Sequence, residues 1–190
     1  PTQGIASLII LSLFDILKRP EAETADYIHA IIEATKAAFN IRDKYVADPD
    51  YMNVLVTKFL SHDSLTQLAS GIDFSHAKPW NTQVDSGDTV WMGAADSDGC
   101  VVSCIQSVYW EFGSGLVLPE TGIVWQNRGI GFSLNQDHHN RLEPMRQPFH
   151  TIQPALANLH DGRVMAYGTM GGEGQPQTQA AIFSRYVTYK

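Results

Sequence analysis

The sequence has few cysteines, which limits the chemistry that thiols could supply. Only Cys100 and Cys104 occur among the 190 residues. They lie four residues apart on an expected strand, a span of about 13 Å that exceeds the reach of a disulfide bond. We therefore predict two free thiols, as is typical of a reducing compartment. A catalytic thiol is disfavoured because neither cysteine has an evident histidine partner.

Clustered positive charge and long apolar runs are also lacking. The net charge is −7 and the lysines and arginines form no cluster, which disfavours the phosphate contacts on which nucleic-acid binding depends. The longest apolar stretch, residues 4–17, is interrupted by Ser7, Ser12 and Asp15 and is shorter than the roughly 20 residues that cross a bilayer. We expect no membrane partner and a cytoplasmic location. The periplasm stays open because the sequence does not begin with Met.

Motifs for metals and nucleotides are absent as well. The seven histidines show no His-x-x-x-His spacing and the chain has no Cys-x-x-Cys pair, so we predict no metal site and no cofactor. The glycine-rich segment "GTMGGEG", residues 168–174, lacks the Lys-Ser or Lys-Thr ending of a P-loop. Its backbone N–H groups can line a site for a phosphate or an oxyanion. On local sequence alone, a plain turn between a strand and a helix is favoured over either.

The patterns that are present place helices first and strands later. We expect helices at residues 5–18, 21–45 and 54–70, a loop at 71–88, a hairpin of strands 90–95 and 100–109, short strands at 122–126 and 163–168, and a final helix at 176–185. The long helical segments carry apolar residues at helical spacing, and Asp98-Gly99 is a strong turn signal between the hairpin strands. This order indicates an α+β layered fold.

Thr89 begins the first of these strands, directly after Gly87 and Asp88. Threonine favours strands, so its presence there needs no functional reason. Alternatively, cleavage of the Asp88–Thr89 bond would free an α-amino group with an unperturbed pKa of about 7.7–8.0, which can act as the base for the threonine's own hydroxyl. The local sequence leaves both interpretations open.

Several motifs together resemble the γ-glutamyltranspeptidase family of N-terminal-nucleophile hydrolases. They are "IHAIIEATKAAFNIRDKYVADPDY" (28–51), "GDT" (87–89), "DSDGCVVSCIQS" (96–107), "FGSGLVLPETGIVWQN" (112–127) and "GTMGGEGQPQTQAAI" (168–182). The resemblance implies a four-layer αββα sandwich, present here as a partial chain. It assigns residues 1–88 to the helical C-terminal part of a large subunit that ends in a cleavage loop, and residues 89–190 to the N-terminal part of the small catalytic subunit.

The resemblance also implies roles for individual residues. The bond between Asp88 and Thr89 matches the family's autocleavage junction, and Thr89 is similar to the nucleophile that cleavage releases. Ser107 stands where the family has a second threonine whose hydroxyl supports the nucleophile. Gly171 and Gly172 match the glycine pair whose backbone N–H groups form the oxyanion hole.

The sequence departs from the family pattern around the substrate. Members that hold a γ-glutamyl group have an asparagine, an aspartate and paired serines where this sequence has Tyr109, Gly131 and His150-Thr151. An α-ammonium group needs an acceptor, and Gly131 has no side chain. The segments "QSVYWEFGSG", "QNRGIGFSL" and "PFHTIQPAL" resemble the branch that contains oxamate amidohydrolase. We therefore expect Arg128, His150 and Thr151 to bind a carboxylate, with Tyr109 in the same pocket; a structural role for Arg128 stays open.

Together these resemblances predict a self-processing amidohydrolase with a threonine nucleophile, acting on a small carboxylate-amide such as oxamate through an acyl-enzyme. The alternatives are a γ-glutamyltransferase or glutathione hydrolase, a glutaryl-type (cephalosporin) acylase, and an unprocessed or non-catalytic fragment. The expected partners are the small-molecule substrate and the remaining large- and small-subunit segments of the same precursor. A homodimer or a heterodimer stays open.

Overall fold

The computed structural model describes residues 1–18, 21–80 and 88–188. The helices are α1 (Gly4–Leu17), α2 (Ala25–Tyr45), α3 (His62–Ser70) and α4 (Gln175–Thr188), with short 3-10 turns at η1 (Pro49–Tyr51), η2 (Val56–Leu60), η3 (Arg128–Gly131) and η4 (Gly172–Gly174). Three antiparallel hairpins pair β1 (Asp88–Ala95) with β2 (Val101–Tyr109), β3 (Val117–Leu118) with β4 (Ile123–Val124), and β5 (Ala155–Asn158) with β6 (Val164–Tyr167).

The helices pack into one layer because α1 and α2 bury apolar side chains against each other. Ile9, Ile10 and Leu13 of α1 are fully buried and share one core with Ala38 of α2. Ala180 brings α4 into the same core. Burial of each large aliphatic side chain stabilises the fold by about 1.5–3 kcal/mol relative to exposure. The helices therefore form one packed layer with a shared apolar core.

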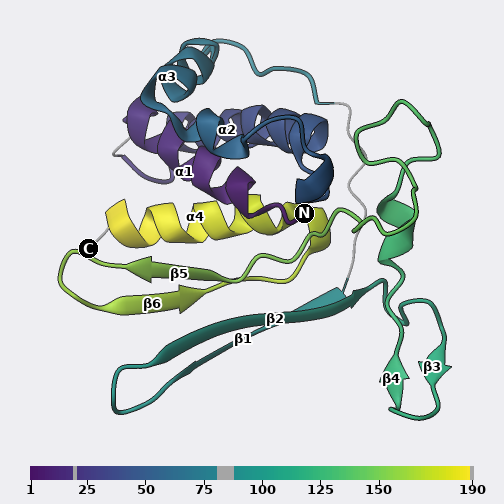
Figure 1. Ribbon diagram of the computed structural model, residues 1–190. Helices are drawn as coiled ribbons and strands as arrows, with labels where there is room; N and C mark the ends of the chain where they lie inside the picture. The colour runs from purple at the N-terminus through teal and green to yellow at the C-terminus, as the bar shows by residue number, and fades with distance from the viewer. Residues whose placement is uncertain (19–20, 81–87, 189–190) are drawn as a thin grey trace.

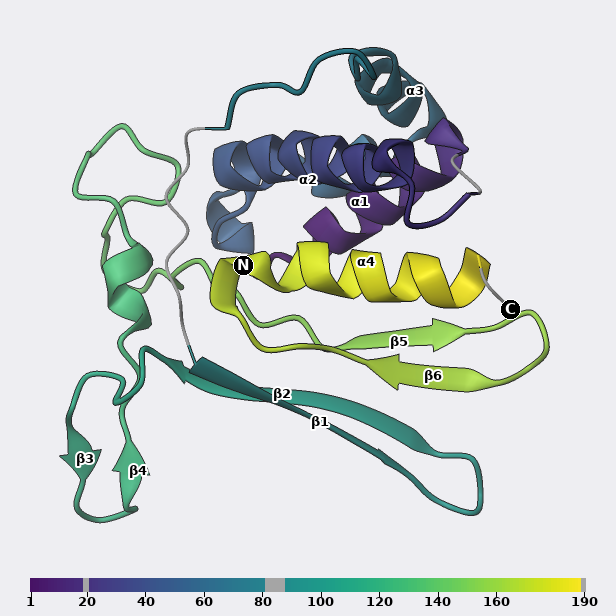
Figure 2. The same cartoon turned by 180° about the vertical axis from the view of Figure 1, so that it is seen from behind.

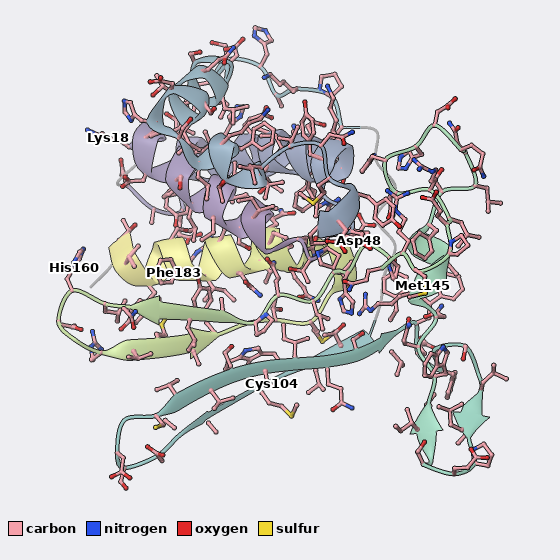
Figure 3. The ribbon with its side chains drawn as sticks, viewed as in Figure 1. Lys18, Asp48, Cys104, Met145, His160 and Phe183 are labelled. Carbon is pink, nitrogen blue, oxygen red and sulfur yellow. The ribbon has the colours of Figure 1, made fainter. Side chains whose placement is uncertain are left out.

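The hairpins lie beneath this layer. Figures 1 and 2 show α1, α2 and α4 on one side of the β5–β6 hairpin and the β1–β2 hairpin on its other side, while β3–β4 projects away from both. Phe183 of α4, labelled in Figure 3, stacks on Tyr167 of β6 with ring centroids 5.1 Å apart. On the opposite side, Ser103 Oγ of β2 donates to the carbonyl of Tyr167 at 3.4 Å. The predicted α+β layering is present.

Local capping corrects the predicted helix boundaries. The helix expected at residues 54–70 is interrupted, because Ser61 adopts an extended backbone and its hydroxyl accepts the N–H of Ser64 at 3.3 Å. This cap starts α3 one residue later, and the preceding residues form only the η2 turn. The second helix begins at Ala25 rather than at residue 21, since the Thr24 hydroxyl accepts the N–H of Tyr27 at 3.2 Å.

The shorter strands were predicted less well. The strand expected at 122–126 is reduced to Ile123–Val124, which pairs with a partner that was not predicted, Val117–Leu118. The strand Ala155–Asn158 was not predicted. The hairpin around Asp98-Gly99 and the final helix are confirmed, with ends that differ by up to three residues. Of the loop expected at 71–88, residues 81–87 lie outside the described residues.

Candidate active site

Thr89 lies near the start of β1, opposite an irregularity in β2. The pairing register shifts between Asp88 and Val90, and β2 carries one residue more than β1 over this interval. Such a β-bulge redirects the neighbouring side chains. Thr89 Oγ1 donates a hydrogen bond to Ser107 Oγ at 3.1 Å. The two hydroxyls that were predicted as nucleophile and supporting residue are therefore in direct contact.

Tyr109 completes the geometry of this bulge. Its backbone has a φ of 80°, in the left-handed region that residues other than glycine rarely adopt. In this conformation its backbone N–H donates to Ser107 Oγ at 3.0 Å. Ser107 Oγ is thus held from two directions, by the hydroxyl of Thr89 and by the N–H of Tyr109.

Gly171 and Gly172 lie between β6 and α4, as predicted. Their φ angles are 108° and 51°, so both need the conformational freedom of glycine. The 14-residue helix α4 begins at Gln175, which puts the glycine pair at a helix N-terminus, where backbone N–H groups and the helix dipole favour negative charge. This arrangement can stabilise an oxyanion.

A close contact connects the glycine-rich loop to the strand of Thr89. A Cβ atom added at Gly168 would lie 2.0 Å from Cδ1 of Trp91, so the indole ring packs directly on the glycine backbone. Trp91 is two residues after Thr89 and is held in place by a hydrogen bond from its Nε1 to Ser103 Oγ at 3.0 Å. The start of the loop is therefore positioned against β1.

Arg128 lies at the start of η3 and contacts two of the predicted substrate residues. Its Nη1 donates to Thr151 Oγ1 at 3.0 Å, and its guanidinium carbon lies 5.0 Å from the centroid of the Tyr109 ring. The Arg128 backbone N–H donates to Gln126 Oε1. Thr151 and Tyr109 thus both contact Arg128 and form one cluster with it. The backbone N–H of Tyr109 also bonds to Ser107, so Tyr109 links this cluster to the hydroxyl pair.

The charge of Arg128 is buried and only partly compensated. The residue is 3% exposed, and its Nε and Nη2 have no hydrogen-bond partner within residues 1–18, 21–80 and 88–188. Burial lowers the pKa of Arg128 to about 10, so the group remains a cation at neutral pH. Nε and Nη2 form one edge of the guanidinium, and this edge matches the two oxygens of a carboxylate.

His150 is neutral at neutral pH. Burial and the nearby charge of Arg128 lower its pKa to about 4. Its Nδ1 accepts the backbone N–H of Ile152 at 3.3 Å, so the ring proton resides on Nε2. His150 therefore offers an uncharged donor to this region rather than a second cation.

Gly131 is the last residue of η3. It stands where the family resemblance places an aspartate in members that hold a γ-glutamyl group. Its carbonyl accepts Asn140 Nδ2 at 2.7 Å, and it contributes no side chain. The position thus offers no carboxylate.

Three buried or partly buried residues beside this region were missed by the sequence reasoning. Gln3 contacts both Thr151 and Gly172, and behind it Arg42 is paired with Glu173. The contacts of Gln3 span from 39 positions, to Arg42, up to 169 positions, to Gly172, and no local pattern indicates that these residues meet.

Other sequence expectations concern features outside this site. Cys100 and Cys104 are free and exposed, which confirms that they do not pair; Figure 3 labels Cys104 on the β1–β2 hairpin. Within the described ranges, His, Cys, Asp and Glu side chains form no group of three or more able to hold a metal ion. Among the helices that the structure describes, none is long and apolar enough to cross a membrane.

The fold and its similarity to a solved structure assign the chain to a class of proteins. The chain has the N-terminal-nucleophile hydrolase fold, as a partial chain that mixes helical and sheet layers. It resembles the crystal structure of a cephalosporin acylase from Bacillus halodurans with a TM-score of 0.87 and 37% sequence identity, over 99% of this chain and 34% of that chain. The predicted fold class is confirmed.

The family follows from the sequence match. The family model of gamma-glutamyltranspeptidase matches residues 1–190, and the chain belongs to the γ-glutamyltranspeptidase family. It is 56% identical over 187 residues to the oxamate amidohydrolase proenzyme of Klebsiella pneumoniae, covering 98% of this chain and 35% of that protein. It is 38% identical over 190 residues to the glutathione hydrolase-like YwrD proenzyme of Bacillus subtilis, covering 99% and 36%. The chain thus spans about a third of the length of these relatives.

Proposed function

We propose that the full-length protein carrying this chain is a self-processing amidohydrolase that acts on a small carboxylate-amide such as oxamate. Cleavage of the Asp88–Thr89 bond frees Thr89 as the nucleophile, and Ser107 supports its hydroxyl. The 3.1 Å hydrogen bond between these two hydroxyls supports the assignment. The names of both relatives, an oxamate amidohydrolase and a glutathione hydrolase-like proenzyme, support amide-bond hydrolysis by a proenzyme, and the first also supports the substrate class.

The proposed reaction has two steps, acylation of Thr89 and hydrolysis of the resulting ester. The Thr89 hydroxyl adds to the amide carbonyl and its proton passes to the free α-amino group of the same residue. Backbone N–H groups of Gly171 and Gly172 stabilise the resulting oxyanion, a contribution of about 2.7–4 kcal/mol for each donor. The C–N bond breaks, the proton leaves with the nitrogen as ammonia, and an ester remains on Thr89. Water then hydrolyses the ester and releases the dicarboxylate and free Thr89.

The observation that carries the substrate class is the edge of Arg128 formed by Nε and Nη2, which has no partner among the residues that the structure describes. A buried cation is unfavourable unless an anion or further hydrogen bonds compensate it. Arg128 is held in place through Nη1 by Thr151 and faces the ring of Tyr109, which leaves Nε and Nη2 for a bidentate carboxylate. His150 adds a neutral donor to the same ligand. A substrate with a carboxylate next to its amide satisfies this cluster.

The same cluster disfavours a γ-glutamyl substrate. Such a substrate carries an α-ammonium group, which would be repelled by the buried Arg128 cation. Neither Tyr109 nor Gly131 provides the carboxylate or amide acceptor that an ammonium group needs. The two γ-glutamyl alternatives are therefore less favoured than a substrate that is only anionic.

We further propose that residues 1–88 and 89–190 belong to the large and the small subunit of one precursor. The length of the relatives supports this, because about two thirds of each lies outside the matched region. The remaining segments of the same precursor are the expected partners, and they would cover the exposed face of the β1–β2 hairpin to complete the sandwich.

Intact-mass analysis and a substrate comparison test this function. The full-length protein should yield two polypeptides, one of which begins at Thr89, and Thr89→Ala should remain a single inactive chain. Thr89→Ser is the matched control, because it retains a hydroxyl and should still cleave. The wild type should release ammonia from oxamate at least tenfold faster than it turns over a γ-glutamyl anilide.

Two results would contradict the proposal. A protein that stays a single chain yet hydrolyses amides would exclude Thr89 as the nucleophile. Equal or faster turnover of the anilide would exclude the substrate class argued from Arg128.

A further inference from the structure

Gln3 is completely buried and links two loops that are distant in sequence. It directly precedes α1 and has no exposed surface. Its Nε2 donates to the carbonyl of Thr151 at 2.6 Å and to the carbonyl of Gly172 at 2.9 Å. Thr151 is the residue that holds Arg128, and Gly172 belongs to the glycine pair. One side-chain amide is therefore bonded to both the proposed substrate loop and the proposed oxyanion loop.

Arg42 fixes the orientation of this amide. Its Nη1 donates to Gln3 Oε1 at 2.9 Å, and because a guanidinium can only donate, the oxygen of the amide must face it. Both N–H bonds of Nε2 then face the two carbonyls. Arg42 is itself immobilised, since its Nη2 pairs with Glu173 Oε2 at 3.1 Å and its guanidinium lies 3.9 Å from the Phe39 ring centroid. The amide cannot turn over without losing all three hydrogen bonds.

The glycine loop needs such an external support. Gly171 and Gly172 have no side chains that could restrict their backbones, and glycine loses more conformational freedom on folding than any other residue. The bond from Gln3 to the Gly172 carbonyl restrains the peptide group that follows Gly172. The bond to the Thr151 carbonyl restrains the residue that anchors Arg128. The side chain of Gln3 therefore bridges these two loops directly.

From this we infer that Gln3 is a positioning residue that holds the carboxylate site and the oxyanion loop in register, an inference that rests on the proposed function. A substrate anchored at Arg128 reaches the N–H groups of the glycine pair only if the two loops keep their spacing. Misplacement by about 1 Å can lower a rate about 100-fold. Loss of the Gln3 bonds should consequently lower kcat.

The test uses three variants of the full-length protein. Gln3→Glu keeps an acceptor for Arg42 but places an oxygen against the two carbonyls. Gln3→Met removes all three hydrogen bonds. Ser7→Ala is the matched control, because Ser7 is buried on the helix that follows Gln3 and its hydroxyl donates at 3.0 Å to Gln153 Oε1. It thus loses a buried bond to the segment that contains Thr151 while leaving the bond to Gly172 intact.

Both Gln3 variants should lower kcat for oxamate by about 10- to 100-fold, a larger factor than any rise in KM, whereas Ser7→Ala should stay within about threefold of the wild type. Hydrogen exchange should be at least tenfold faster in peptides covering 149–153 and 169–174 in both Gln3 variants. In Ser7→Ala the 169–174 peptide should be unchanged. If only one of the two Gln3 variants folds, comparing that variant with the wild type and with Ser7→Ala is sufficient for the test.

The inference is overturned if the Gln3 variants keep kcat within threefold of the wild type, if Ser7→Ala lowers kcat as much as they do, or if exchange rises in only one of the two peptides. A wild type that hydrolyses neither oxamate nor a γ-glutamyl anilide would refute the proposed function instead. In that case the exchange comparison still decides whether Gln3 holds the two loops together.

Discussion

Replacement of Arg128 by methionine should separate stability from activity. Methionine is long, unbranched and uncharged, so it can occupy the volume of the buried side chain while the cation is removed. In the part of the wild-type chain that the structure describes, the guanidinium donates a hydrogen bond to Thr151 and contacts the ring of Tyr109. We expect Arg128→Met to fold at least as stably as the wild type and to lose the ability to bind a carboxylate.

The expected change in the free energy of unfolding follows from the lowered pKa of Arg128. Burial lowers the pKa of Arg128 from 12.5 to about 10, and at about 1.4 kcal/mol per unit this corresponds to roughly 3 kcal/mol against the charged form in the folded protein. The lost hydrogen bond to Thr151 contributes about 1 kcal/mol and the lost contact with Tyr109 about another 1 kcal/mol. The free energy of unfolding should therefore rise by about 1 kcal/mol.

Activity should change in the opposite direction. Hydrogen bonds to charged groups are worth about 1.5–3 kcal/mol each, and a bidentate carboxylate loses two of them. Since 1.4 kcal/mol is a factor of ten, kcat/KM for oxamate should fall at least 100-fold. Arg128→Lys retains the charge without the two-pronged edge and should recover only part of this loss.

Urea unfolding and ammonia release from oxamate are the two measurements. Arg146→Met is the matched control, because Arg146 is also nearly buried, at 8% exposure, but is paired with Glu143 at 3.3 Å. That variant should be destabilised by about 1–3 kcal/mol with KM unchanged. If Arg128→Met is destabilised as strongly as Arg146→Met and its KM for oxamate stays at the wild-type value, Arg128 is a structural residue and the substrate argument fails.

Two further predictions concern the loop contacts and pH. Gly168→Ala should lower the free energy of unfolding by about 1–3 kcal/mol, because the added Cβ would lie 2.0 Å from Trp91. Gly129→Ala is the control and should stay near the wild type, because nothing lies within 4 Å of its added Cβ. Urea unfolding distinguishes the two variants, and equal midpoints would contradict the packing argument. Because the pKa of His150 is lowered to about 4, the unfolded chain binds more protons there between about pH 6.5 and 4, so stability should fall as pH decreases through this window. His150→Gln should flatten that fall, and an identical pH profile would refute it.

The sequence predicted the parts of this site that depend on local patterns. Apolar spacing located the helices, and Asp98-Gly99 located the hairpin, because helix faces and tight turns are determined by neighbours in sequence. The family resemblance then selected Thr89, Ser107 and the glycine pair. Of these, the contact between the two hydroxyls is now visible in the geometry, while their catalytic roles remain to be tested.

The parts that were missed depend on contacts between distant residues. Gln3 meets Gly172 across 169 positions, and a glutamine before an apolar helix looks like an ordinary surface residue. The break at Ser61 was missed because a serine inside an apolar pattern is compatible with a helix, and only its extended backbone makes it a cap. The charge state of His150 depends on burial and on Arg128, which no spacing rule reveals.

Tyr109 connects the strained backbone of this site to its specificity. A left-handed φ costs a residue of this kind about 1–2 kcal/mol, whereas asparagine, which the family resemblance associates with γ-glutamyl binding at this position, adopts it more readily. In this chain the strained backbone directs the N–H of Tyr109 to Ser107 Oγ. The contact of the tyrosine ring with the Arg128 guanidinium contributes a stabilisation of similar size, which offsets this cost. In the proposed function, the geometry of the Thr89–Ser107 pair would thus depend on the backbone of Tyr109, and carboxylate recognition by Arg128 on its side chain.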